Sequence, residues 1–364
     1  MESGKEIATS DWKDLLQQSI RSPKHLPPGI QSLKQVTRSY PMLINPYFLE
    51  VCQHKGEALW KQVVPDIREL DDPVGLTDPL AEERDSPVPN LTHRYPDRVL
   101  FLVSNQCAVY CRFCTRKRKI GQWKHISDEI IESGIRYISE QPQIKDVLLS
   151  GGDPLLLEDE RLAWILAGIR NIPHVDIIRI GSRVPGVLPQ RVTPALVKIL
   201  QAAQPLYLNL HFNHPEEITA SVRDACLRLA HAGIPMGSQT VLLRDINDDS
   251  EVLVRLFREL LKIRIKPYYL LQGDLTRGTN HFRTRVETGI GLMAQLRGYI
   301  SGLAVPHYVI DLPGGGGKIP LVPDYIVTLN SEYLVVRNYE GKLFQIPQTG
   351  EYSLSRKAAA AAHS

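Results

Sequence analysis

This sequence of 364 residues lacks long apolar runs, an even set of cysteines and a strong excess of one charge. No stretch approaches the roughly 20 apolar residues that a transmembrane helix needs, so we expect no membrane protein. The 43 basic and 40 acidic side chains leave a net charge of only +3, which does not predict binding to nucleic acid or to a membrane surface. The five cysteines are an odd and sparse set, so a disulfide framework is not expected. The first residues, Met1 to Trp12, are polar and carry three acids; no secretory signal is visible, and we expect a cytoplasmic enzyme.

The middle of the chain alternates between strand-like and helix-like segments. Short apolar runs predict strands at Val99–Ser104, Asp146–Ser150, Val175–Ile180, Leu206–Leu210, Met236–Leu243 and Pro267–Leu271. Helical spacing predicts helices at Asp128–Glu140, Asp159–Arg170, Pro194–Ala203, Glu216–Ala232, Ser250–Ile263 and Val286–Ile300. Such alternation predicts a parallel sheet with right-handed crossovers, and it favours a barrel or partial barrel. A doubly wound sheet is the alternative, because alternation alone does not fix closure.

The two ends of the chain differ from this middle part. We predict a helical N-terminal region over residues 1–95, an α/β partial barrel over 96–304 and a small C-terminal segment over 305–364. The C-terminal segment contains an apolar run at Pro306–Asp311, four glycines before Lys318, and strand-like runs at Tyr325–Leu329 and Tyr333–Arg337. The isolated Cys52 and Cys226 lie on helical patterns, and we interpret both as core residues, since free cysteine behaves as a small hydrophobe.

The other three cysteines, Cys107, Cys111 and Cys114, lie within eight residues of one another, directly after the first predicted strand. Three thiolates need a distant fourth ligand to complete a structural zinc site, and the sequence contains no second C-x-x-C to supply one. Three thiolates do suit a [4Fe–4S] cluster in which one iron stays open for another ligand. A zinc site completed by a remote His or Asp, and three incidental cysteines, are the alternatives.

C-x3-C-x2-C after a first barrel strand is the fingerprint of the radical S-adenosylmethionine superfamily, and the surrounding motifs resemble the lysine 2,3-aminomutase family. These motifs are Thr92–Arg98, Tyr110–Arg116, Ser150–Pro154, His211–Ile218, Lys266–Tyr269 and Pro313–Lys318. The resemblance runs from about Asp78 to Gly341. It implies an α/β fold with a partial (β/α) TIM-like barrel of the radical S-adenosylmethionine type. It also implies an isomerase that interconverts L-lysine and L-β-lysine by a 1,2-amino shift, with a [4Fe–4S] cluster, S-adenosylmethionine and pyridoxal phosphate as cofactors.

The resemblance also implies a role for particular residues. Cys107, Cys111 and Cys114 would bind the cluster, and Lys318 would be the catalytic, pyridoxal-binding lysine. The residues that match the other cofactor-binding segments are Arg94, Tyr95 and Arg98 for pyridoxal phosphate, and Ser150, Gly151, Gly152 and Asp153 for S-adenosylmethionine. Arg116 matches the arginine that pairs with the substrate carboxylate. Asp274 and Asp311 match the two aspartates that hold the side-chain ammonium of lysine, a pair that glutamate 2,3-aminomutases lack.

Elementary chemistry agrees with several of these assignments. Glycines at 151 and 152 let the backbone approach a ligand, arginine suits a phosphate dianion, and a lysine on a glycine-rich bend can reach a bound aldehyde. The Gly-Gly-Gly-Gly-Lys run is no P-loop, because Ile319 stands where a Ser or Thr would bind magnesium. His211 and His214 are interpreted as pocket-lining at most, and Lys117 to Lys119 as a solvated basic face.

Alternatives to lysine conversion stay open. The chain could act on another cationic amino acid, make β-lysine for modification of elongation factor P, or be a non-catalytic iron–sulfur protein. The C-terminal cysteines that bind structural zinc in clostridial-type relatives are not present in this sequence. Beyond an amino-acid substrate, the resemblance implies a reductant such as flavodoxin or ferredoxin, and it allows a homo-oligomer.

Overall fold

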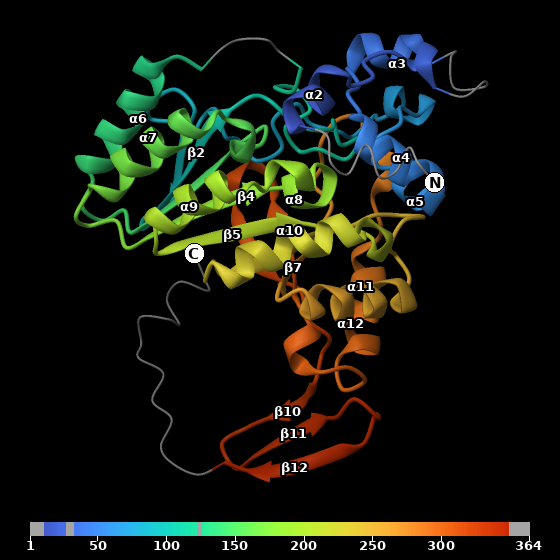
Figure 1. Cartoon of the computed structure of the whole chain (residues 1–364). Coiled ribbons are helices and arrows are strands. Elements are labelled where there is room, and N and C mark those ends of the chain that lie inside the picture. Colours follow the sequence, from blue (N-terminus) through green and yellow to red (C-terminus); the bar gives the residue numbers. More distant parts are fainter. Residues whose placement is uncertain (1–10, 27–32, 122–125, 349–364) are drawn as a thin grey trace.

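A nine-stranded sheet forms the centre of the protein, and its strands lie side by side in chain order. The computed structural model describes residues 11–26, 33–121 and 126–348 (Figure 1). The strands of the sheet are β1 Leu91–Tyr95, β2 Arg98–Ser104, β3 Asp146–Gly151, β4 Ile177–Ser182, β5 Leu206–His211, β6 Met236–Leu242, β7 Lys266–Gln272, β8 His307–Leu312 and β9 Gly317–Pro320. Seven of them, β2 to β8, are parallel to one another, whereas β1 and β9 pair antiparallel at the two edges.

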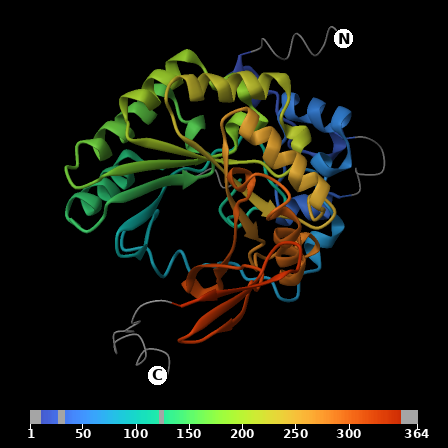
Figure 2. The ribbon, with the colours of Figure 1, turned by 90° about the horizontal axis from the view of Figure 1, so that it is seen from below.

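The sheet is strongly curved, and helices cover its outer side (Figure 2). These helices are α6 Asp128–Ser139, α7 Asp159–Arg170, α9 Pro194–Ala202, α10 Ala220–His231, α11 Ser250–Lys262 and α12 Val286–Leu296. Several begin where a side chain caps the first turn: Thr193 accepts from the amide of Leu196, and Thr219 accepts from the amide of Val222. The predicted partial barrel is therefore confirmed, as are the parallel strands from which it is built.

The core lies between the curved sheet and the helices. Every second residue of a strand lies on the same face of the sheet, and on β3 two such residues, Val147 and Leu149, are fully buried. On α11 the buried residues Leu253, Leu256, Phe257 and Leu260 recur at the spacing of one helix face. The prediction that Cys52 and Cys226 are core residues is confirmed, since they are 2% and 0% exposed.

Short helices precede the sheet, and a separate small sheet follows it (Figure 1). The remaining helices are α2 Trp12–Gln17, α3 Lys34–Ser39, α4 Pro46–Lys55, α5 Glu57–Trp60 and α8 Val184–Val187. Single 3-10 turns are η1 Pro23–His25, η2 Ile67–Leu70, η3 Pro154–Leu156, η4 Pro189–Arg191, η5 Pro215–Glu217, η6 Asn280–Phe282, η7 Gly302–Ala304 and η8 Pro313–Gly315. The small sheet consists of β10 Ile326–Leu329, β11 Tyr333–Arg337 and β12 Leu343–Pro347.

The predicted division of the chain near residues 95 and 305 stays a prediction. Within it, β1 precedes the first boundary, and β8 and β9 follow the second, although all three belong to the nine-stranded sheet. Across the described ranges, none of the helices combines the length and the apolar character that a membrane span requires.

Two glycines on α12 offer a matched test of how tightly this helix packs on β8. A Cβ at Gly289 would lie 2.1 Å from Cζ of the buried Tyr308, whereas a Cβ at Gly291 would meet nothing within 4 Å. Because overpacking a core costs about 1–3 kcal/mol, we expect Gly289→Ala to lower the free energy of unfolding by about 2 kcal/mol. Gly291→Ala should leave it unchanged or raise it by up to about 1 kcal/mol through helix propensity. Denaturant unfolding of the cofactor-free protein compares the two, and equal stability would contradict the packing.

Candidate active site

The three clustered cysteines lie on the loop that follows β2. Each side chain is partly exposed, and Cys107 and Cys114 pack against the apolar cluster around Tyr110. Burial raises the pKa of the Cys114 thiol to about 11 and that of Cys107 well above its usual value, and neighbouring thiolates add to both shifts. Three thiolates therefore need a strong positive charge among them, which a metal cluster would supply.

The donor set distinguishes a cluster from a single ion. Among the described residues, no three His, Cys, Asp or Glu side chains are placed to hold one metal ion. In a [4Fe–4S] cluster each cysteine binds a different iron, so the sulfurs need not converge on one point. Three soft thiolate ligands thus suit an iron–sulfur cluster.

Arg183, which directly follows β4, contacts this cysteine loop. Its Nη1 donates to Sγ of Cys111 at 2.8 Å, and its Nη2 lies 3.2 Å from Oε2 of the buried Glu217. The guanidinium thus places a positive charge beside the sulfur of a candidate cluster ligand. Sequence reasoning missed Arg183, although its place at the carboxyl end of a predicted parallel strand was a usable signal.

The Ser150–Asp153 segment packs directly against the start of the cysteine loop. The amide of Gly152 donates to the carbonyl of Ser104 at 2.6 Å, and the amide of Asp153 donates to the carbonyl of Gln106 at 2.6 Å. A Cβ at Gly151 would lie 2.0 Å from the Ser104 carbonyl oxygen, so only glycine permits this approach. The two glycines thus bring the end of β3 beside the candidate cluster ligands.

The carboxylate of Asp153 is buried and already has four donors. Its Oδ2 accepts from the amides of Arg183 at 2.7 Å and Val184 at 3.1 Å and from the hydroxyl of Ser182 at 3.0 Å, and its Oδ1 accepts from the amide of Leu155 at 3.1 Å. Burial raises its pKa to about 6 despite these hydrogen bonds. In the structure this carboxylate ties the ends of β3 and β4 together, and its predicted contact with S-adenosylmethionine stays a prediction.

Lys318 lies on β9, opposite Asp311 of β8 in the antiparallel register. Its Nζ forms an ion pair with Oδ2 of Asp311, and its backbone amide donates to the hydroxyl of Tyr95 at 2.9 Å. Since Tyr95 belongs to β1, this hydrogen bond joins the two edge strands of the sheet. The candidate pyridoxal lysine is therefore where the incomplete barrel comes closest to closing.

The glycine bend before Lys318 packs against β1. Gly314, Gly315 and Gly317 have φ values of 66°, 81° and 88°, which residues with a side chain rarely adopt. A Cβ at Gly315 would lie 3.1 Å from Nε of Arg94. The bend thus brings backbone amides and an arginine side chain to one place, an arrangement that suits a phosphate.

Arg94 on β1 and Arg98 at the start of β2 both have partners within the protein. Nε of Arg94 donates to Oδ2 of Asp85 at 3.1 Å, and the Arg98 guanidinium lies 3.8 Å from the centre of the Tyr95 ring. With Lys318 and the glycine bend, they form a cationic surround that fits pyridoxal phosphate. Their assignment to that cofactor stays a prediction.

Asp274 and Asp311 line one cavity, together with Phe113, Thr115 and Phe282 among others. The Thr115 hydroxyl donates to Oδ2 of Asp274 at 2.7 Å. Burial and, to a smaller extent, the charge of Asp311 raise the pKa of Asp274 to about 6, while the Thr115 hydrogen bond, Lys318 and Arg116 oppose the shift. Two aspartates that lie 37 residues apart in the sequence therefore share one pocket.

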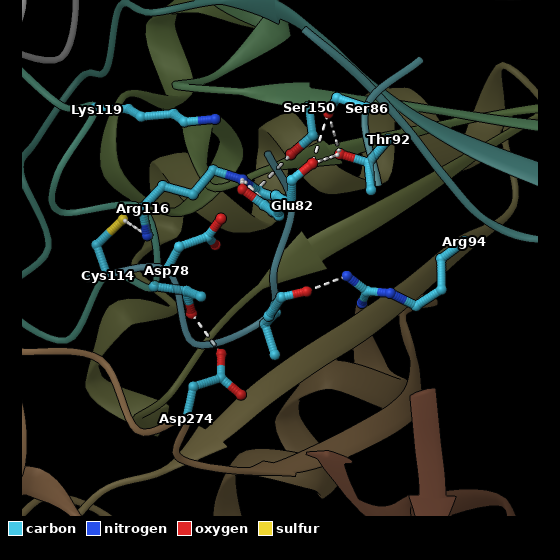
Figure 3. A network of polar contacts seen from close by, with 12 residues as sticks. Asp78, Glu82, Ser86, Thr92, Arg94, Cys114, Arg116, Lys119, Ser150 and Asp274 are labelled. Carbon is cyan, nitrogen blue, oxygen red and sulfur yellow. Dashed lines mark hydrogen bonds and ion pairs between the residues drawn. The ribbon is translucent and has the colours of Figure 1, made fainter. Parts of the chain in front are cut away.

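Arg116 lies between two other parts of the site (Figure 3). Its Nη2 and Nε lie 2.7 and 3.0 Å from Oε1 of Glu82, and its Nη1 lies 3.5 Å from the Ser150 hydroxyl. The Glu82 side chain is only 3% exposed. Sequence reasoning did not single out Glu82, since an acid in a polar segment before β1 gives no sign of burial.

The interpretation of Lys117 to Lys119 as a solvated basic face is wrong for the first two residues. Lys117 is buried, and its Nζ lies 2.7 Å from both Oε2 of Glu69 and the carbonyl oxygen of Gly278. Arg118 forms ion pairs with Asp78 at 2.9 Å and with Glu82 at 3.4 Å. The run therefore fixes the cysteine loop against the segment that precedes the barrel and against the loop between β7 and α12.

His211 and His214, at and just after the end of β5, have structural environments. His211 stacks on Phe113 with ring centres 5.4 Å apart, and burial lowers its pKa to about 3. His214 caps η5 by accepting from the amide of Glu216. A neutral stacked ring and a helix cap agree with the expectation that neither is an acid–base group.

Comparison with known proteins identifies close relatives. Residues 293–363 match the family described as lysine-2,3-aminomutase, and residues 101–257 match the radical SAM superfamily. An L-lysine 2,3-aminomutase of Clostridium subterminale is 46% identical over 93% of this chain and 84% of that protein. A glutamate 2,3-aminomutase of Clostridioides difficile is 44% identical over 86% of this chain and 75% of its own length. The crystal structure of a radical SAM methyltransferase from Sphaerobacter thermophilus, at 18% identity, covers 60% of this chain and 67% of its own with a TM-score of 0.43.

The buried ion pairs of Glu69 lead to a stability prediction. Its carboxylate is fully buried between Arg112, at 2.6 Å, and Lys117. Replacing it with glutamine leaves two buried cations without a counter-charge, so we expect Glu69→Gln to lower the free energy of unfolding by about 3–5 kcal/mol. Glu57→Gln is the control, because Glu57 is 77% exposed and pairs only with Lys61; a change within about 0.5 kcal/mol is expected there. Urea unfolding followed by circular dichroism measures both, and similar losses would show that the buried triad is unimportant.

Proposed function

The chain belongs to the lysine 2,3-aminomutase family of radical S-adenosylmethionine enzymes, and we propose that it interconverts L-lysine and L-β-lysine by a 1,2-amino shift. The observation that carries the choice of lysine is the cavity that Asp274 and Asp311 share. The ammonium of Lys318 pairs with Asp311, so the site already accommodates an alkylammonium group. The side-chain ammonium of a lysine substrate has the same chemistry.

Three cofactors fit the residues that surround this cavity. We infer that Cys107, Cys111 and Cys114 hold a [4Fe–4S] cluster, that Ser150–Asp153 contacts S-adenosylmethionine, and that Lys318 holds pyridoxal phosphate beside Arg94, Tyr95 and Arg98. When bound, these groups supply the one-electron chemistry that removes a hydrogen atom and the conjugated system on which nitrogen migrates.

The task of the protein is then to hold both ends of the substrate. Arg116 offers a guanidinium to the carboxylate, and the aspartate pair accepts the ammonium at the other end. Lys318 would hold pyridoxal phosphate through its side-chain amine, and Asp311 lies within reach of that amine when it is a free ammonium. A substrate fixed at two charged ends has little freedom to move, which favours a single reacting carbon.

Family membership alone does not determine the amino acid, since a glutamate 2,3-aminomutase is among the relatives. Two aspartates would repel the side-chain carboxylate of glutamate, whereas they attract a cation. Arginine and ornithine share that cationic end, so another cationic amino acid is the second candidate. Production of β-lysine for elongation factor P modification would use the same chemistry.

Further components follow from this chemistry. We infer that a small reductant such as flavodoxin or ferredoxin supplies the electron. All five cysteines are free thiols, which agrees with the reducing conditions of the cytoplasm. A homo-oligomer stays a prediction.

Anaerobic incubation of the reconstituted protein tests the proposal. The protein receives S-adenosylmethionine, pyridoxal phosphate, reductant and one of L-lysine, L-ornithine, L-arginine or L-glutamate. Chiral chromatography should detect β-lysine over many turnovers and little product from glutamate. Conversion of glutamate in preference to lysine would overturn the substrate assignment, and no conversion of any amino acid would overturn the reaction.

Replacement of Lys318 separates the pyridoxal role from the cluster. We expect Lys318→Ala to abolish β-lysine formation and retention of pyridoxal phosphate, while iron and sulfide content stays at the wild-type level. Lys342→Ala is the matched control, because Lys342 is 67% exposed and its ion pair within the described residues is with Glu340. Wild-type turnover by Lys318→Ala would refute its role.

The aspartate pair should give the reaction a pH dependence. The pKa of Asp274 is raised to about 6 without substrate, so below that pH the carboxyl is protonated and loses its attraction for an ammonium. We therefore expect kcat/KM for lysine, which reports groups of the free enzyme, to fall as the pH drops below about 6. Asp274→Asn should lower kcat/KM by about tenfold or more at neutral pH and flatten this decline.

The exposed Asp176 provides the control for this experiment. Asp176→Asn changes the charge by the same amount and should keep the wild-type pH profile. An unchanged profile in Asp274→Asn would show that another group causes the decline.

A further inference from the structure

Glu82 is an acidic residue with an unusual combination of burial and charge. It lies in the segment before β1, and its side chain is 3% exposed. Arg116 and Arg118 both contact its carboxylate. Burial alone would raise the pKa of Glu82, but these cations more than offset it, so the pKa is lowered and the side chain is a carboxylate at neutral pH.

The contact between Glu82 and Arg116 uses one particular edge of the guanidinium. Nε and Nη2 lie 3.0 and 2.7 Å from Oε1, and Nε lies 3.3 Å from Oε2. A guanidinium has five N–H donors in a planar fork. Glu82 engages the Nε hydrogen and one Nη2 hydrogen, so the two Nη1 hydrogens and the second Nη2 hydrogen do not point at Glu82. The contact that the described residues offer to Nη1 is a long one, 3.5 Å, with the Ser150 hydroxyl. The outer edge of Arg116 can therefore still receive a second carboxylate.

Glu82 is itself anchored from the side of β1. Its carbonyl oxygen accepts from the Ser86 hydroxyl at 2.6 Å and from the Thr92 hydroxyl at 3.4 Å. Thr92 belongs to β1, the strand that also carries Arg94 and Tyr95 (Figure 3). Glu82 thus links the orientation of Arg116 to the strand that contacts Lys318.

We propose that Glu82 is a positioning residue that holds the Arg116 guanidinium so that its outer edge faces the substrate carboxylate. This inference rests on the proposed function, in which Arg116 binds that carboxylate. The rival idea, that Glu82 occupies the carboxylate position until substrate displaces it, agrees less well with the contacts. Displacement would take Arg116 away from a buried carboxylate; among the described residues its remaining ion-pair partner is Arg118, at 3.4 Å, and Lys119 is a further nearby charge.

Three variants distinguish these ideas. Glu82→Gln removes the charge and the second acceptor, and Glu82→Asp keeps the charge but shortens the side chain. Glu83→Gln is the matched control: it makes the same change one residue along, at a side chain that is 67% exposed and pairs with Arg118 and Lys119, with no ion pair to Arg116 among the described residues.

Two measurements on the anaerobic holoenzyme provide the readouts. The first is the dissociation constant of L-lysine without S-adenosylmethionine, followed by the absorbance of pyridoxal phosphate, so that no turnover takes place. The second is the number of 5′-deoxyadenosine molecules formed for each β-lysine. A misplaced substrate wastes S-adenosylmethionine, whereas a smaller folded fraction lowers both products equally and leaves the ratio unchanged.

We expect Glu82→Gln to raise the dissociation constant by about tenfold or more, since small misplacements near the reacting atoms have effects up to about 10²-fold. The number of 5′-deoxyadenosine molecules formed for each β-lysine should rise as well. Glu82→Asp should raise both values less, and Glu83→Gln should match the wild type. If Glu82→Gln does not fold, the test rests on Glu82→Asp. A wild-type dissociation constant and a wild-type ratio of products in Glu82→Asp would mean that only the charge matters, and positioning would be refuted.

Two other outcomes overturn the inference. Tighter lysine binding by Glu82→Gln would show that Glu82 competes with the substrate. Wild-type values in Glu82→Gln, in a protein that makes β-lysine, would refute positioning while the proposed function stands. A wild-type protein that neither binds nor converts lysine would instead refute the proposed function, and the role of Glu82 with it.

Discussion

The antiparallel return of β9 along β8 is the constraint on which the rest of the site depends. The register places Lys318 opposite Asp311, and a slip of one residue would turn the lysine side chain to the other face of the sheet. Two features fix that register: a bend made of glycines with positive φ, and the hydrogen bond from the Lys318 amide to Tyr95 of β1. Because β1 and β9 are the two edges of the sheet, one contact both nearly closes the barrel and sets the position of the lysine.

Charges at this end of the barrel are paired before any ligand arrives. Lys318 pairs with Asp311, Arg116 with Glu82 and Arg94 with Asp85. A charged ligand therefore meets side chains that already have a counter-charge, and its binding does not depend on uncovering isolated charges, which would be costly in a partly buried site. Asp274 differs, since its hydrogen-bond donor is the neutral Thr115 hydroxyl. Its raised pKa marks it as the carboxylate that gains most from an incoming ammonium.

The strands and helices of the barrel could be predicted from the sequence because each depends on local apolar spacing. The clustered cysteines and the glycines before Lys318 were recognisable for the same reason: their spacing is local. Buried ion pairs were not predictable. Glu69 and Lys117 are 48 residues apart, and Glu82 and Arg116 are 34 apart, so nothing near either partner indicates that it will be buried. The sequence therefore predicts a solvated Lys117, and within the N-terminal region it assigns only Arg94 and Tyr95 to the site, although that region also supplies both glutamates.

The same contacts indicate how substrate choice can change within this fold. The α-amino and carboxylate groups are common to all amino acids, so only the far end of the pocket can select among them. Asp311 pairs with Lys318, and its replacement would disturb the lysine that holds the cofactor as well as the substrate. Asp274 feels the charge of Lys318, but within the described part of the chain its side-chain hydrogen bond is to Thr115 and it forms no ion pair with Lys318. A change of charge at position 274 can therefore alter the preferred side chain while leaving the cofactor residues in place, and Asp311 can change only if Lys318 acquires another partner.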